Sequence, residues 1–79
     1  MRVLEVPNPL TWCRQLDPSP HIAAPKSRGL LATVALVMAD GRLTAYLPDN
    51  DTELDQLLDE CIHRHAFWLL FSVPKGAVT

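Results

Sequence analysis

Two apolar runs, residues 30–38 and 42–47, stand out along the chain and are separated by Asp40 and Gly41. Both runs are rich in residues that favour strands. Asp-Gly is a preferred two-residue hairpin turn, because both turn residues must adopt a positive φ. The sequence therefore predicts a β-hairpin over residues 30–47.

Helical spacing of apolar residues follows the hairpin. The positions that recur three and four apart are Leu54, Leu57, Leu58, Cys61, Ile62 and His65. Polar residues at 49–51 can cap the start of a helix, and acids in its first turn interact favourably with the helix dipole. We therefore expect the main helix over about 51–65.

The last apolar run, residues 67–73, predicts a strand that ends at Pro74. In an alternative interpretation the helix continues to about residue 70, because Trp68 and Leu69 keep the helical period.

The N-terminal third contains shorter elements. Residues 2–6 predict a strand, and Asn8 followed by Pro9 is typical of a helix start, which favours a short helix over 9–16. Prolines interrupt the chain after this helix, so the segment 7–28 is expected to be a proline-rich loop with a short helix.

These elements predict one α+β domain over residues 1–79. We expect a small, mainly antiparallel sheet of about four strands, including the hairpin 30–47, with the main helix 51–65 packed on one face. A short N-terminal helix or loop and a flexible tail over 75–79 complete the prediction.

The hairpin register places apolar residues on both faces of this sheet. With a two-residue turn, Leu36 faces Ala45 on one face. Side chains on the opposite face include Val37, Thr44 and Tyr46. A face that meets water normally carries polar residues. One helix covers one face, so we expect residues 7–28, a second copy or another protein to cover the other.

Composition and charge narrow the classes of function. Hydrophobic residues make up 48% of the 79 residues, and the formal net charge is −2. The seven Lys and Arg residues are scattered, so direct nucleic-acid binding is not expected. Six of the nine acids fall between residues 49 and 60, and Asp51, Asp55 and Asp59 share one helix face.

Apolar runs and cysteine content bear on the cellular setting. The longest unbroken apolar run, residues 66–71, is far shorter than a membrane span, and the N-terminal residues lack a secretory-signal pattern. Two cysteines are fewer than small secreted domains usually carry, although one disulfide is the alternative. We expect a cytoplasmic protein that does not act at a membrane.

Cysteine and histidine residues are the candidates for chemistry. Cys13, His21, Cys61 and His65 could together supply four zinc ligands, but their spacing matches no standard zinc module. A thiol nucleophile at Cys61 with His63 or His65 as base lacks an evident orienting group. We therefore expect neither a catalytic residue nor a cofactor.

The resulting hypothesis is a non-enzymatic protein-binding domain, a small regulator or inhibitor of the kind that phages and plasmids carry. The partner is another protein or a second copy, which would give a homodimer. The expected contact residues are Tyr46, Val37, Thr44, Trp68 and Phe71 on the sheet, with Asp51, Asp55 and Asp59 on the helix. The alternative is a metal-dependent or nucleic-acid-associated regulator that uses the Cys and His ligands.

Overall fold

The computed structural model describes residues 1–16 and 30–78 and shows a small α+β domain. The elements are β1 (Arg2–Leu4), α1 (Pro9–Leu16), β2 (Leu31–Ala39), β3 (Arg42–Leu47), α2 (Asp51–His63), β4 (Phe67–Pro74) and a final 3-10 turn (Lys75–Ala77). The predicted helices, hairpin and last strand are confirmed to within about two residues at their ends.

The four strands form one open antiparallel sheet in the order β1-β3-β2-β4. The predicted hairpin register is confirmed, since Met38 pairs with Leu43 and Leu36 with Ala45. Asp40 and Gly41 adopt φ of 55° and 72°, as the two-residue turn requires. The two edges of the sheet are therefore β1, which has three residues, and β4, which has eight.

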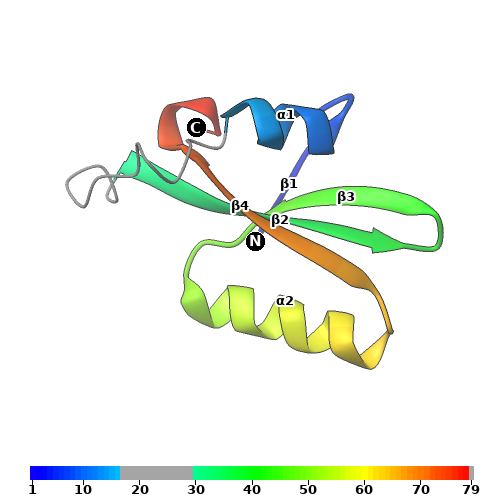
Figure 1. The fold of residues 1–79 in the computed structure, drawn as a ribbon. Coiled ribbons are helices and arrows are strands. Elements are labelled where there is room, and N and C mark those ends of the chain that lie inside the picture. Colours follow the sequence, from blue (N-terminus) through cyan, green and yellow to red (C-terminus); the bar gives the residue numbers. More distant parts are fainter. Residues whose placement is uncertain (17–29, 79) are drawn as a thin grey trace.

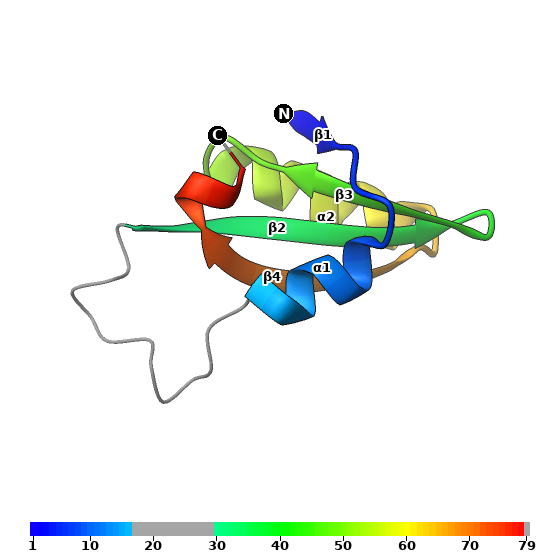
Figure 2. The same cartoon turned by 90° about the horizontal axis from the view of Figure 1, so that it is seen from above.

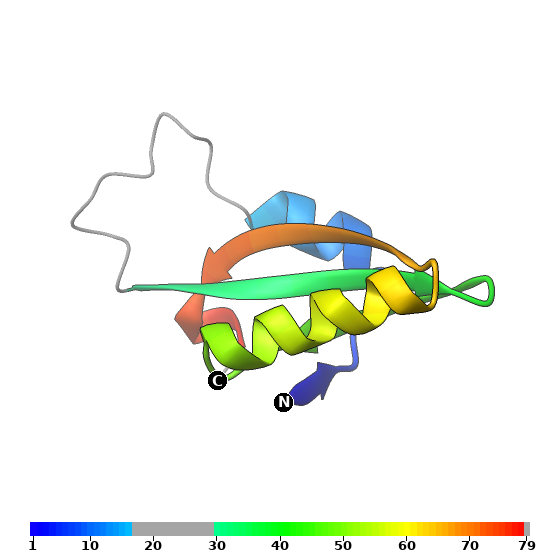
Figure 3. The same cartoon turned by 90° about the horizontal axis from the view of Figure 1, so that it is seen from below.

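The sheet is the middle of three layers, with α1 on one face and α2 on the other (Figure 1). Seen from above, α1 lies across β4 and β2 (Figure 2). Seen from below, α2 runs along the opposite face (Figure 3). Both faces are therefore covered by helices of the same chain, although neither helix covers the whole sheet.

Each helix has its own hydrophobic core. The cluster under α1 contains the buried residues Cys13, Val34, Leu36, Ala45, Val73 and Val78. The cluster under α2 contains the buried residues Ala35, Val37, Leu57 and Cys61, with Tyr46, Leu54 and Ala66 packed against them. Alternate residues of β2 enter opposite clusters, which explains why this strand is apolar at every position from Val34 to Val37.

Both ends of α2 are capped. The side chain of Asn50 accepts a hydrogen bond of 2.9 Å from the backbone N–H of Glu53. At the other end, the N–H of Ala66 donates to the carbonyl of Cys61 at 2.9 Å, and that of His65 to Ile62 at 3.3 Å. This pair of bonds is a Schellman motif, with His65 in the left-handed region at φ 55°.

This cap decides between the two predictions for the region after the helix. The chain turns at His65, and β4 begins at Phe67, so the alternative helix to about residue 70 is wrong. An L-residue at positive φ cannot continue a right-handed helix.

The C-terminal segment differs from the predicted flexible tail. Lys75–Ala77 form a 3-10 turn, and Val78 is buried in the cluster under α1. The guanidinium of Arg2 donates a hydrogen bond to the carbonyl of Val78, which connects β1 to this turn. The tail prediction missed the burial of Val78 because a single apolar residue carries no periodicity.

Candidate protein-interaction surface

The most exposed apolar surface lies on the first half of β4. Phe67 is 78% exposed, Leu69 55%, Leu70 45% and Trp68 37%. These residues alternate between the two faces, because Phe67 and Leu69 pair with Met38 and Leu36 of β2, whereas Trp68 and Leu70 pair with Val37 and Ala35. We call residues 67–70 the β4 patch.

The two helices leave much of the β4 patch uncovered. On β4 only Val73 and Phe71 belong to the cluster under α1, and none of residues 67–70 belongs to either buried cluster. The patch also lies on an edge strand, and within residues 1–16 and 30–78 no strand pairs with the outer side of its backbone (Figures 1 and 2).

A shallow groove of about 340 Å³ adjoins the β4 patch on the α1 side. It is lined by the apolar residues Leu10, Leu36, Met38, Leu43, Phe67, Trp68 and Leu69. Leu10 at the start of α1 and Met38 at the end of β2 are 38% and 41% exposed, so they extend the apolar surface beyond β4.

The opposite edge of the sheet is built differently. β1 contains only Arg2, Val3 and Leu4, and Pro7 lies shortly after it. The N-terminal ammonium lies 3.6 Å from the Asp49 carboxylate and 3.3 Å from that of Glu53. Short length, charge and proline are the features by which edge strands resist further pairing. β4 has none of them before Pro74.

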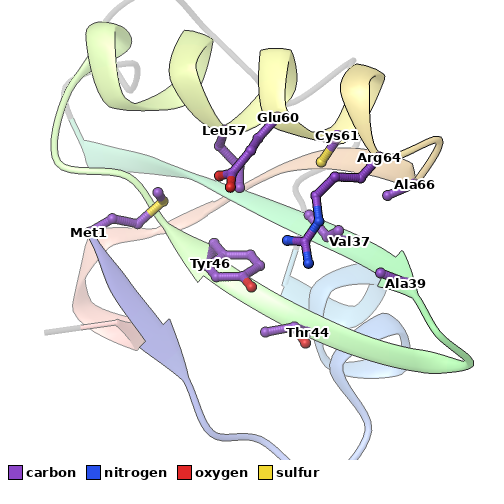
Figure 4. Close-up of a pocket in the computed structure, with 10 residues that line it drawn as sticks. All are labelled: Met1, Val37, Ala39, Thr44, Tyr46, Leu57, Glu60, Cys61, Arg64 and Ala66. Atoms are coloured by element: carbon purple, nitrogen blue, oxygen red, sulfur yellow. The ribbon is translucent and has the colours of Figure 1, made fainter.

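The contact residues predicted on the hairpin lie under α2. Val37 is 8% exposed and belongs to the core cluster there, and Tyr46 packs against the same cluster. Figure 4 shows Tyr46 and Thr44 of β3 facing α2 across a small cavity of about 130 Å³. The sequence pattern predicts the main helix on the face of Leu36 and Ala45. In the structure this helix, α2, covers the opposite face, which carries Val37. Val37 is thus buried, whereas Thr44 and Tyr46 are half-buried beside α2.

The cavity in Figure 4 offers little room for a ligand. The side chains of Glu60 and Arg64 extend from α2 toward the sheet at its mouth, and Leu57 and Cys61 form part of its wall. Small-molecule sites usually have volumes of roughly 300–1,000 Å³. A cavity of about 130 Å³ is suited to water or to a single small group.

Of the other predicted contact residues, Trp68 belongs to the β4 patch, and Phe71 is half-buried against the α1 cluster. Phe67, Leu69 and Leu70 were not predicted. Their signal in the sequence is the absence of any charge between Ala66 and Pro74, but only the strand order shows that this run is an edge.

The acidic residues predicted for partner binding, Asp51, Asp55 and Asp59, are all exposed on α2. Asp59 lies 3.8 Å from the imidazole of His63 one turn later. In the first turn, the backbone N–H of Asp49 donates to the Glu53 carboxylate at 2.9 Å. This hydrogen bond, together with the N-terminal ammonium, lowers the pKa of Glu53 below its ordinary value of 4.5.

The predicted metal and thiol residues are not gathered into one site. Cys13 and Cys61 are buried on opposite faces of the sheet, so no disulfide joins them. Burial raises the pKa of the Cys61 thiol above 9.0, and the negative charge of Glu60 adds to this effect. His63 and His65 are exposed, whereas His21 lies outside the described residues. Within residues 1–16 and 30–78, no three potential ligands are close enough to hold a metal ion.

Two further findings bear on the class of protein. No protein-family model, curated protein sequence or solved structure matches this chain. Over the part of the chain that the structure describes, neither helix is long and apolar enough to cross a membrane.

Proposed function

We propose that this chain is a non-enzymatic protein-binding domain whose contact surface is the β4 patch with the adjoining groove. The observation that supports this proposal is the exposure of four consecutive large apolar residues on an edge strand, led by Phe67 at 78%. Contiguous exposed apolar surface of this kind usually marks an interface, and an open strand edge is a common docking site for another chain.

A small regulator or inhibitor is the role that fits this surface. The domain offers an exposed apolar edge strand, and such a strand acts by occupying a surface of its partner. The exposed acids of α2 form a second surface that would favour a partner with basic residues nearby.

A cytoplasmic setting is part of the proposal. Both cysteines are buried in separate cores, and buried thiols are compatible with a reducing compartment.

Site-specific photocrosslinking in the cells that produce the protein tests the proposal. The photoreactive residue p-benzoylphenylalanine would replace Phe67 in one variant and Ile62 in a matched control. Ile62 is also apolar and 59% exposed, but it lies on α2. We expect crosslinked protein adducts from position 67 and few from position 62. Absence of adducts at position 67, or equal yields at the two positions, would contradict the proposed surface.

A further inference from the structure

The open edge of β4 matches one strand in particular, namely β4 of a second copy. We infer that two copies pair β4 to β4 in antiparallel orientation about a twofold axis perpendicular to the sheet. The four strands of each copy would then form one continuous eight-stranded sheet. This inference rests on the proposed function, because it names the partner of the same surface.

Backbone geometry requires a strand as the occupant. β4 pairs with β2 on one side, and its other side is the edge of the sheet. The N–H and C=O groups along that side are directed outward, and an added strand satisfies them in sequence. A twofold axis makes the contact isologous and the pairing antiparallel, as all other pairs in this sheet are.

Side chains on both faces of β4 match those of a second β4. In an antiparallel pair, directly opposed residues lie on the same face. Pairing centred on Leu69 places Phe67 opposite Phe71 and Trp68 opposite Leu70 of the other copy. This register uses the exposed half of the strand, whereas Val73, farther along, is already fully buried in its own core.

Charge also favours a second copy over a charged partner. No charged residue lies between Ala66 and Pro74, so two β4 strands can approach without like-charge repulsion. A strongly acidic or basic peptide would find no counter-charge along this strand. The exposed acids Asp51 and Asp55 belong to the first half of α2, and none of the β4 patch residues belongs to the buried cluster under that helix.

The available area fits a weak dimer. Scaled from typical side-chain areas, the β4 patch exposes about 400 Å² per copy. Two patches therefore offer at most about 800 Å² for burial, less than the roughly 1,200 Å² at which standard-size interfaces begin. We therefore expect a dimer that dissociates on dilution.

The first part of the test is light scattering with size-exclusion chromatography over a range of concentrations. Wild type should show twice the chain mass at high concentration, and Leu69→Lys should show the mass of one chain. Ile62→Lys is the matched control and should remain dimeric, because Ile62 is exposed on α2. Circular dichroism checks that Leu69→Lys is folded, and Phe67→Lys at the most exposed position provides a second disrupting variant.

The second part locates the axis. Two copies of residue 69 face each other in the inferred register, so Leu69→Cys should form a disulfide-linked dimer under mild oxidation. Ile62→Cys should not, and it also reports any linkage through the native thiols. A dimer that survives Leu69→Lys and Phe67→Lys, or that gives no disulfide from Leu69→Cys, overturns the β4 pairing.

The two proposals fail differently. If wild type is monomeric at all concentrations while position 67 crosslinks to another polypeptide, the self-pairing is wrong and the protein-binding function stands. If wild type is monomeric and position 67 gives no adduct, both are wrong.

Discussion

His65 adopts a backbone conformation that is strained for any residue with a side chain on its α-carbon. Its φ of 55° is needed to reverse the chain after α2, and the Schellman hydrogen bonds of Ala66 and His65 depend on it. Glycine is the residue that adopts this region without steric cost, because it has no Cβ. The chain therefore gives up some stability at this position.

We predict that His65→Gly stabilises the protein by about 1 kcal/mol, because it removes the cost of the left-handed conformation. His63→Gly is the matched control and should destabilise by about 1 kcal/mol, since residue 63 lies in the last turn of α2. Urea denaturation of the two variants measures both effects. A loss of stability in His65→Gly would mean that the imidazole makes an interaction stronger than the strain.

Glu53 predicts a specific dependence of stability on pH. Its pKa is lower in the folded protein than in the unfolded chain, mainly because its carboxylate accepts a hydrogen bond from the Asp49 N–H. The carboxylate therefore stabilises the fold fully above about pH 4.5, and this contribution disappears as the pH falls through the folded pKa.

We expect Glu53→Gln to be less stable than wild type at pH 7 and to approach it at pH 3. Thermal unfolding at a series of pH values tests this expectation. A constant difference between the two proteins across the series would show that the charge of Glu53 does not contribute.

At the scale of elements, one row of buried side chains on α2 packs the helix against the sheet. Leu57 is 6% exposed and packs on Ala35 and Val37, whereas Ile62 on the same helix is 59% exposed. We predict that Leu57→Ala destabilises by about 2–4 kcal/mol, through lost burial and the cavity left behind. Ile62→Ala should change stability by about 0.5 kcal/mol or less. Chemical denaturation measures both, and similar losses would contradict this packing.

The apolar pattern of β2 shows which part of the fold can be predicted from the sequence. Val34 and Leu36 alternate with Ala35 and Val37, which predicts that both faces of the sheet are covered. The pattern does not say which element covers which face. α1 has eight residues, and its packing through Trp12 and Cys13 is a tertiary contact that its local sequence does not specify.

The candidate site was predicted incompletely for a related reason. The apolar run that contains Phe67 and Leu69 was recognised as a strand, but strand order decides whether a strand is central or at an edge. In a central strand these residues would be core. At the edge they form an exposed apolar surface, two strands away from β3, where Tyr46 shares a row of the sheet with Leu70.

For the whole molecule, self-association would couple stability to concentration. A dimer that binds only folded chains shifts the unfolding equilibrium by mass action. We predict that the melting temperature of wild type rises with protein concentration, whereas that of Leu69→Lys does not. Differential scanning calorimetry over a hundredfold concentration range tests this. Identical concentration dependence in both proteins would place the contact elsewhere.

The contrast between the two sheet edges has a consequence for how large an assembly can become. In a β4-to-β4 pair, the β4 edge of each subunit would be occupied. Both outer edges of the joined sheet would then be β1. The three residues of β1, with Arg2 among them, offer little template for another strand. In the inferred dimer, growth would therefore stop at two subunits, so a segment with the composition of a fibril-forming peptide would yield a closed particle instead of a filament.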